Sequence, residues 1–348
     1  MTASVPRMDR FWIDEVLRQA GGTTASDLVL EPQDDGGLLA RLRVDGVYRT
    51  HSSCPAAQAA AAVARLKALA GVAAYIRDEP QDGRIDGRAF GIAGDLRAAF
   101  FPTVRGPRAA VRLPALGPLP PPEGLGLPAA ALSGLRAALR APQGLLLVCG
   151  PTGSGKTTTI HSLLCELAAE RPDRQILTIE DPVERRLAGV AQGEVKPHLG
   201  LGFAEALRAG LRQDPDVLVI GEVRDPETAQ AVVRAALTGH LVVTTLHCGR
   251  AAEALPRLLE MGVAAELLLP ALRGVLAQRL VRRRSGDSYT GRCALADWCE
   301  PDHAARLAWV RGQAPPLLVD LDQQAAALVA AGTTDAAEVA RAIGGRAC

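Results

Sequence analysis

The sequence predicts an α/β protein whose larger part is built on a helix-covered parallel sheet, and two observations carry this prediction. First, the segment 150–157 fits the pattern G-x-x-x-x-G-K-[ST] and lies between an apolar run, 144–149, and a helical pattern. Second, further apolar runs alternate with helical patterns along the chain, as parallel sheets require. The runs that we expect to be strands are 145–149, 176–179, 217–220 and 241–245.

The glycine-rich segment follows a strand and opens a helix whose apolar residues fall at positions i, i+3, i+4 and i+7. This arrangement aims backbone N–H groups and a helix N-terminus at a polyphosphate. We expect Lys156 to reach the β- and γ-phosphates and the Thr157 hydroxyl to bind Mg²⁺. The sequence therefore predicts that the chain binds a nucleoside triphosphate with Mg²⁺. The predicted nucleotide-binding residues are Gly150, Pro151, Thr152, Gly153, Ser154, Gly155, Lys156, Thr157 and Thr158.

The first half predicts a small α+β domain, residues 1–112. Residues 28–31 and 39–44 are expected strands separated by an Asp/Gly turn, followed by an Ala-rich helix over 55–70. More strands are expected around 84–90 and 94–112. A stretch rich in Pro and Gly, 113–128, predicts a semi-rigid linker.

The second predicted domain spans 129–348, and its pattern is helical from about Ala251 onward. Within it, Arg282, Arg283 and Arg284 form a short basic run that we interpret as a solvated helix end. The formal net charge is only +1, so composition gives no reason to expect direct nucleic-acid binding.

The seven cysteines are scattered without a C-x-x-C pair, so no zinc site is expected and a reducing compartment is favoured. The first 15 residues are too charged for a signal peptide, and no apolar run approaches the ~20 residues that a membrane span needs. These features predict a cytoplasmic protein that could still dock on a membrane complex.

Acidic residues follow two of the predicted strands. Glu180 and Asp181 come directly after 176–179, and Glu222 comes after 217–220. Because the carboxyl ends of parallel strands share one edge, Glu222 and Glu180 are candidate catalytic carboxylates, whereas Asp181 could equally hold the turn at the following proline. His240 and His247 bracket the strand 241–245, where an imidazole could contact or sense the γ-phosphate.

The order of these segments resembles the secretion ATPases of the GspE/PulE/PilB type, the motors of type II secretion and type IV pilus assembly. The matching segments are the phosphate loop (Walker A), 179–184 (Asp box), 211–225 ending in Gly-Glu-Val-Arg-Asp (Walker B, with Arg224) and 238–247 (His box). The resemblance implies a RecA-like P-loop NTPase core.

The resemblance extends into the first half, over roughly Ala25 to Trp298 in all. Residues 25–32 and 41–46 are similar to the opening of the family's PAS-like α+β domain. Arg97 and Arg112 match two arginines that, in the family, reach the nucleotide phosphates from that domain. A cation there can neutralise charge developing on the γ-phosphoryl group.

The chain also departs from the family pattern. No cysteine pair follows 278–280, where many members carry a four-cysteine zinc module, and the family's first amino-terminal domain has no room before Phe11. Residues 248–250 replace a common Thr-Asn-Asp, and Pro107-Arg108 stands where Glu-Arg is usual. These departures lie outside the phosphate chemistry and affect the expected partner.

The resemblance implies an ATP-hydrolysing homohexamer that docks on an inner-membrane platform and drives pseudopilus or pilus assembly. Rival interpretations are a pilus-retraction motor, whose usual Ala-Ile-Arg-Asn-Leu-Ile-type segment is missing here, and a competence-type DNA-uptake motor. A different class is a scaffold that binds ATP without hydrolysing it, against which the presence of Glu222 argues. A RecA-like DNA motor fits least, because no basic patch is evident.

Overall fold

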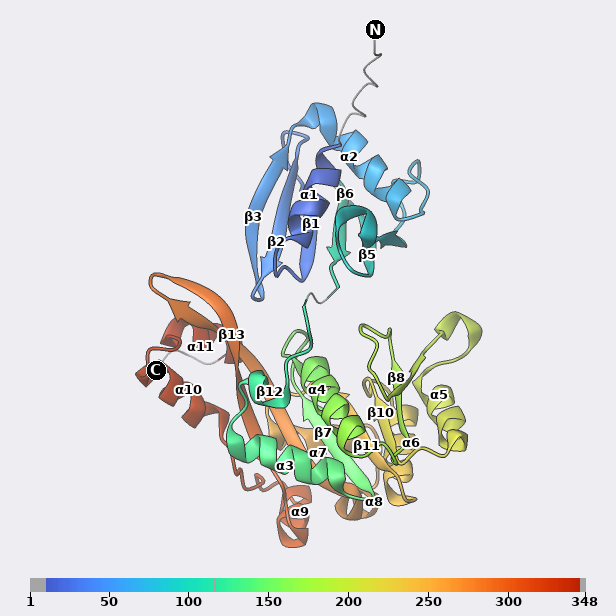
Figure 1. Cartoon of the computed structure of the whole chain (residues 1–348), viewed down its shortest axis with the longest axis vertical. Coiled ribbons are helices and arrows are strands. Elements are labelled where there is room, and N and C mark those ends of the chain that lie inside the picture. The colour runs from blue at the N-terminus through green and yellow to red at the C-terminus, as the bar shows by residue number, and fades with distance from the viewer. Residues whose placement is uncertain (1–10, 115–116, 345–348) are drawn as a thin grey trace. The chain divides into compact units, whose positions relative to one another are not determined.

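Two separate β-sheets organise the chain, each in its own compact unit. The computed structural model describes residues 11–114 and 117–344, and the units are Met1–Gly117 and Pro118–Cys348 (Figure 1). Both units combine helices with a sheet, so the predicted α/β class is confirmed. The expected linker 113–128 is divided between the units: the Ser162 hydroxyl donates to the Pro120 carbonyl at 2.7 Å, which fixes the later part of that segment to the second unit.

The first unit is built on a six-stranded antiparallel sheet with the strand order β3-β2-β1-β6-β5-β4. Burial alternates along its strands, so that in β5 Leu96, Ala98 and Phe100 are buried while Arg97 is exposed. One face of the sheet therefore carries the apolar core, shared with α1 and α2, and the other carries the exposed side chains. The elements are α1 Trp12–Gly21, β1 Asp27–Pro32, β2 Leu38–Val44, β3 Val47–Cys54, α2 Ala56–Leu69, β4 Gln81–Asp86, η1 Gly87–Phe90, β5 Asp95–Thr103 and β6 Gly106–Arg112.

The second unit is built on a seven-stranded sheet with the order β13-β12-β7-β11-β10-β8-β9. All neighbouring strands run parallel except β12 and β13. The strands are β7 Gly144–Cys149, β8 Ile176–Glu180, β9 Ala191–Glu194, β10 Val217–Ile220, β11 Leu241–Leu246, β12 Leu272–Ser285 and β13 Ser288–Cys299. The four strands predicted for this half are thus confirmed.

Helices cover both faces of this sheet, as buried parallel strands require. Leu146 and Val148 of β7 share a core with α3 Ala129–Arg140 and α4 Lys156–Glu170. Leu145 and Leu147 point to the opposite core, with α6 Pro226–Leu237. The remaining helices are η2 Pro122–Leu125, η3 Pro197–Leu199, α5 Phe203–Gly210, η4 Leu211–Gln213, η5 Ala251–Glu253, α7 Ala254–Glu260, α8 Ala265–Ala271, α9 His303–Val310, α10 Leu321–Ala330 and α11 Ala336–Ile343.

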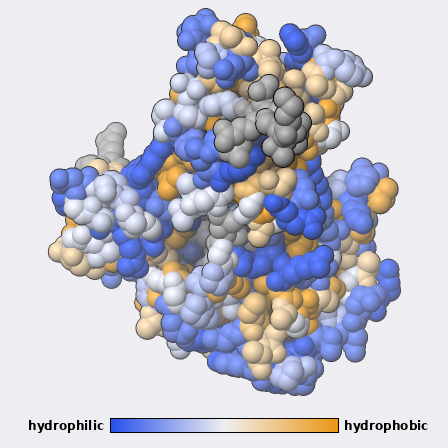
Figure 2. Space-filling model, turned by 45° about the horizontal axis from the view of Figure 1, so that its top comes forward, coloured by the Kyte–Doolittle hydropathy of each residue, from blue (hydrophilic) through white to orange (hydrophobic). Residues whose placement is uncertain are grey.

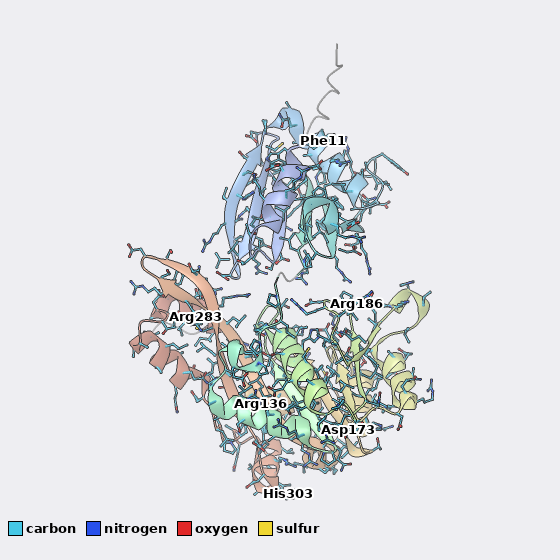
Figure 3. All side chains as sticks on the ribbon, viewed as in Figure 1. Phe11, Arg136, Asp173, Arg186, Arg283 and His303 are labelled. Carbon is cyan, nitrogen blue, oxygen red and sulfur yellow. The ribbon has the colours of Figure 1, made fainter. Side chains whose placement is uncertain are left out.

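Arg136 fastens three of these elements together (Figure 3). From α3, its Nε donates to Glu166 Oε1 on α4 at 2.6 Å, and the guanidinium also pairs with Glu123 on η2. The helix that follows the glycine-rich loop is therefore held against its neighbours by charge-assisted hydrogen bonds as well as by apolar packing.

The expectation of a helical pattern from Ala251 onward is wrong for 272–299, which form the long β12–β13 hairpin. The first part of β12 is buried on both faces, so its apolar residues do not alternate, and only pairing with β7 (Leu276 beside Val148) makes them a strand. Arg282, Arg283 and Arg284 accordingly lie on β12 and not at a helix end. Arg282 pairs with the buried Glu338 of α11, with its Nε 2.9 Å from Oε2.

Hydrophilic side chains cover most of the face drawn in Figure 2, with apolar residues in small scattered patches. None of the helices within residues 11–114 and 117–344 has the length and the apolar character that crossing a bilayer demands.

Candidate functional site

The glycine-rich loop connects the buried strand β7 to the N-terminus of α4 (Figure 1). Gly150, Gly153 and Gly155 have φ values of 150°, 79° and 90°, which disfavour residues with a side chain. A Cβ on Gly150 would lie 2.6 Å from the Gln278 carbonyl oxygen, and one on Gly155 would lie 2.7 Å from Gln278 Nε2. The loop can therefore take this shape only with glycine at these two positions.

Two polar side chains of the loop are arranged as a phosphate site would need them. Lys156 is only 9% exposed, and its ammonium donates to the carbonyls of Gly150 at 2.7 Å and Pro151 at 3.0 Å. The Ser154 hydroxyl is buried and has no hydrogen-bond partner in the described part of the chain. Burying a hydroxyl without a partner costs free energy, so this atom points to a ligand that would satisfy it.

The environment of Lys156 has a direct electrostatic effect. Burial lowers the pKa of its ammonium, and Arg279 adds to this, while Cys149 and Glu222 act in the opposite direction. The exposed residues of the loop and of the first turn of α4 are Pro151, Thr152, Gly153, Thr157 and Thr158. Backbone amides, a buried cation and an unpaired hydroxyl at a helix N-terminus fit a polyphosphate ligand.

Gln278 on β12 packs against the glycine-rich loop, a contact that the sequence motifs did not predict. Its side chain is 2% exposed and accepts a hydrogen bond from the Thr159 hydroxyl of α4 at 2.9 Å. Its carbonyl and amide are also the atoms that approach Gly150 and Gly155. No local sequence signal indicates this contact, because it depends on the pairing of β12 with β7.

The carboxyl ends of β10 and β11 bring Glu222 and His247 together. Hydroxyls of β11 fasten the neighbouring strand end, since Thr245 Oγ1 donates to the Gly221 carbonyl at 2.7 Å. His247 Nε2 then lies 3.1 Å from Glu222 Oε2, and Arg224 forms an ion pair with the other oxygen of Glu222. The Glu222 side chain is 14% exposed, whereas His247 and Arg224 are open to solvent.

These two partners determine the charge state of Glu222. Burial alone would raise the pKa of its carboxyl, but hydrogen bonds from Arg224 and His247 outweigh burial and hold the pKa below its usual range. Glu222 is therefore an ionised carboxylate at neutral pH. It also retains access to solvent. It lies at the carboxyl end of β10, which is separated in the sheet from the phosphate-loop strand β7 only by β11.

Glu180 also lies at a strand end, but it is 6% exposed and surrounded by donors. The Thr178 hydroxyl donates to its Oε1 at 2.6 Å, the Gln192 amide donates to the same oxygen at 2.9 Å, and His161 Nε2 lies 3.2 Å from Oε2. Asp181, the next residue, is exposed. Glu180 is one of the candidate catalytic carboxylates, and the local sequence does not indicate any of these three donors.

His240 is not at this edge. It precedes β11, and its carbonyl accepts from the Gly144 amide at the start of β7, so it lies at the end of the sheet opposite the glycine-rich loop. Its Nδ1 is 3.3 Å from the Ala235 carbonyl. The expectation that both histidines flank the phosphate-loop edge is therefore wrong for His240, because a strand separates residues at its two ends by its full length, ~3.3 Å per residue.

Arg97 and Arg112 belong to the first unit, where they are direct cross-strand neighbours on β5 and β6. Arg84 on β4 is in turn the neighbour of Arg97. Both predicted arginines are exposed; Arg112 Nε lies 3.3 Å from Asp27 Oδ1 of β1, the next strand in the row. Three arginines on adjacent strands thus form one cationic row on the exposed face of the sheet.

The residues that could hold a cation are few. No group of three or more His, Cys, Asp or Glu side chains is arranged as a metal site within residues 11–114 and 117–344. Near the loop, the oxygen donors include the exposed Thr157 hydroxyl and the Glu222 carboxylate, whose charge acts on Lys156. This donor set fits Mg²⁺, which is usually held by one or two protein oxygens together with phosphate and water.

Fold and site together combine a glycine-rich loop between a buried strand and a helix with an acidic residue and a histidine at adjacent strand ends. The family described as Type II/IV secretion system protein matches residues 6–314, and the chain belongs to this family. The resemblance inferred from the motifs is thereby confirmed.

The chain is similar to several curated relatives. It is 44% identical over 273 residues to the type IV pilus assembly ATPase PilB of Thermus thermophilus and 46% identical over 273 residues to the type II secretion system protein HxcR of Pseudomonas aeruginosa. Each match covers 78% of this chain, but only 30% and 57% of the relatives. The chain thus spans from under a third to somewhat over half of their length.

Two solved structures share the fold over nearly the whole chain. The pilus retraction motor PilT with bound ADP is 28% identical, with 94% of this chain and 92% of that chain covered and a TM-score of 0.63. The Legionella pneumophila ATPase DotB is 21% identical, with 97% and 96% covered and a TM-score of 0.72. The latter likeness concerns the fold alone.

Proposed function

We propose that this chain is a Mg²⁺-dependent ATPase that powers type II secretion or type IV pilus assembly. The single observation that carries the proposal is the prebuilt phosphate cradle, with its buried Lys156 and unpaired Ser154 hydroxyl, in a chain of the secretion family. The names of the relatives support a role in type II secretion or type IV pilus assembly, and the ADP bound to PilT supports a nucleotide ligand.

In this proposal the loop amides, Lys156 and Ser154 hold the phosphates. Thr157 and Glu222 are the protein oxygens for Mg²⁺, which would neutralise phosphate charge when bound. Glu222 also orients the attacking water, because it is ionised yet open to solvent, and His247 and Arg224 hold its two oxygens in place. Arg97 and Arg112 neutralise charge on the terminal phosphate.

The proposal extends to architecture. We take the second unit, with its helix-covered parallel strands and phosphate loop, as a RecA-like core, and the first unit as a PAS-like domain. The active form is a homohexamer, cytoplasmic and peripherally bound to an inner-membrane platform of the secretion apparatus. Neither zinc nor nucleic acid takes part.

The decisive experiment is steady-state ATP hydrolysis by the purified chain, beside Lys156→Ala and Glu222→Gln. We expect the wild type to turn over only with Mg²⁺ and each variant to lose at least about 100-fold, since each removes a group that acts on the phosphates or the water. Binding of a fluorescent ATP analogue should fail for Lys156→Ala and persist for Glu222→Gln. Equal turnover in all three proteins would refute the assignment, and ATP binding without turnover in the wild type would favour the scaffold interpretation.

One observation favours a second candidate, a pilus-retraction motor. The match to PilT covers 94% of this chain and 92% of that chain, with 28% identical residues. Restoring secretion or piliation in a strain deleted for the chain's gene would support assembly. Hyperpiliation after the same deletion would instead indicate retraction.

A further inference from the structure

Glu180 is the centre of a closed hydrogen-bond network that the proposed mechanism does not explain. Its carboxylate accepts from side chains on three different elements: His161 on α4, Thr178 on β8 and Gln192 on β9. A carboxylate that receives several donors while being almost fully buried is fixed in one orientation. The network therefore fixes the end of β8, the strand next to β10 and Glu222.

His161 is the member of this network that comes from the phosphate-loop helix. It lies five residues after Lys156 and is 5% exposed, and its Nε2 lies 3.2 Å from Glu180 Oε2. Burying an imidazole costs free energy unless it is hydrogen-bonded. This contact therefore explains how a polar side chain is tolerated on the buried face of α4. A neutral ring with its proton on Nε2 satisfies the geometry as the donor.

Gln192 carries the network onward to the chain that follows Glu180. Besides donating to Glu180, its amide donates to the Arg185 carbonyl at 2.9 Å, and its oxygen accepts from the Leu187 amide at 2.7 Å. The segment 181–187, which includes the Arg186 labelled in Figure 3, is thus linked through Gln192 to the same carboxylate that His161 contacts.

We propose that His161 is a positioning residue for the ATPase reaction: it holds the Glu180 carboxylate, and through Gln192 the segment 181–187, in fixed register with the helix that carries Lys156 and Thr157. This inference rests on the proposed function. It assigns Glu180 as the hub that orders the strand edge, and His161 acts only through Glu180.

The electrostatics agree with this arrangement. Burial raises the pKa of the Glu180 carboxyl, but the hydrogen bonds from His161, Thr178 and Gln192 together hold the pKa below its usual range. Removing the imidazole leaves a buried carboxylate short of one donor. A carboxylate in that state can rotate toward other donors and release the segment that it holds.

The test compares three single variants and one double variant. His161→Leu removes the donor at similar size, and His161→Gln restores an amide N–H near the Nε2 position. Glu180→Gln removes the charge, and His161→Leu/Glu180→Gln completes the cycle. Ser162→Ala is the matched control, because it is buried on the same helix but donates to Pro120 instead of Glu180.

We expect His161→Leu to lower kcat by about 10- to 100-fold, the usual effect of losing a partner that orients a functional side chain, with KM for ATP changed less than about twofold. His161→Gln should recover most of the turnover. In the Glu180→Gln background, His161→Leu should have little further effect on kcat, because the carboxylate that His161 positions is already absent. Ser162→Ala should keep the wild-type kcat.

A second readout does not depend on turnover. Deuterium exchange of the ligand-free protein should become faster in peptides covering 181–194 in His161→Leu, and remain slow in Ser162→Ala. Multiplicative losses of kcat in the double variant, or unchanged exchange in 181–194, would overturn the inference. An inactive wild type would defeat the proposed function instead, while the exchange experiment would still decide the role of His161.

Discussion

The two units differ in where their most notable charged side chains lie. In the second unit, buried charges have partners within the fold: Lys156 is bonded to loop carbonyls, Glu180 to three donors, and Glu338 to Arg282 and Arg341. On the exposed sheet face of the first unit, Arg97 lies between Arg84 and Arg112 in cross-strand register, and Arg112 also pairs with Asp27. Like charges directly opposite one another in a sheet are destabilising.

The difference bears on how each unit could bind an anionic ligand. A site whose groups are already held needs little reorganisation when a ligand arrives. A row of neighbouring arginines can take up an added anion, since a guanidinium binds phosphate with paired hydrogen bonds. The proposed role of Arg97 and Arg112 toward the nucleotide phosphates has this character.

The largest effect is expected from Gly150→Ala, which tests whether the glycine-rich loop of the second unit is already held in the shape that binds phosphate. The new Cβ would lie 2.4 Å from Ser154 Oγ and 2.6 Å from the Gln278 carbonyl, at a φ of 150°, so the loop must change shape. Affinity for a fluorescent ATP analogue should fall more than about tenfold, because a forbidden backbone geometry and a clash together exceed 1.4 kcal/mol.

Gly153→Ala is the control, because a Cβ there meets no atom within 4 Å and only its φ of 79° is unfavourable, a cost of about 1 kcal/mol. If both alanine variants weakened binding equally, the close packing of the loop on Gln278 would not determine the loop conformation that binds ATP.

A second experiment tests the paired charges of the second unit through stability. Burial opposes ionisation of Glu338, but Arg341 and Arg282 outweigh it and lower the pKa of Glu338 to about 2. A lowered pKa in the folded state stabilises the fold above the unfolded pKa, and this contribution is lost as pH falls from about 4.5 toward 2. The linkage relation gives about 3 kcal/mol at neutral pH.

Glu338→Gln should therefore lower the free energy of unfolding in urea at pH 7 by about 2–3 kcal/mol and by much less near pH 2. Glu227→Gln, whose carboxylate pairs with Arg208 at an exposed position, should cost under ~1 kcal/mol. A similar cost for both variants would mean that burial of Glu338 does not make its ion pairs contribute more to stability than the exposed pair of Glu227 does.

The smallest expected effect on stability concerns the arginine row, and its sign is the informative part. Arg97→Gln should raise the stability of the first unit by a few tenths of a kcal/mol, because it removes a repulsion. The same change should lower ATP turnover about tenfold if Arg97 acts on the terminal phosphate. Arg88→Gln is the control, since Arg88 is already bound to Asp86 at 2.9 Å. A variant that lost stability and kept its turnover would contradict the comparison.

Local pattern predicted the parallel strands and the loop with few errors, because each of them is determined over a short stretch. A strand buried on both faces is a continuous apolar run, and the glycines of the loop are required by backbone geometry and close contact. The β12–β13 hairpin escaped prediction, since β12 becomes a strand only by pairing with β7. His240 was misplaced although it precedes its strand, because the loop lies at the carboxyl ends of the parallel strands and a residue before β11 lies at the other end.

The sequence by itself determined the α/β class, the family and the identity of the residues Gly150–Thr157, Glu180, Glu222 and His247 as candidates, since these depend on residue type and spacing along one chain segment. Only the tertiary structure decided which of them meet. It joined Glu222 to His247, surrounded Glu180 with His161 and Gln192, placed Gln278 under the loop and aligned Arg97 with Arg112. These contacts link segments far apart in sequence, and sheet register and packing alone bring such segments within hydrogen-bond distance.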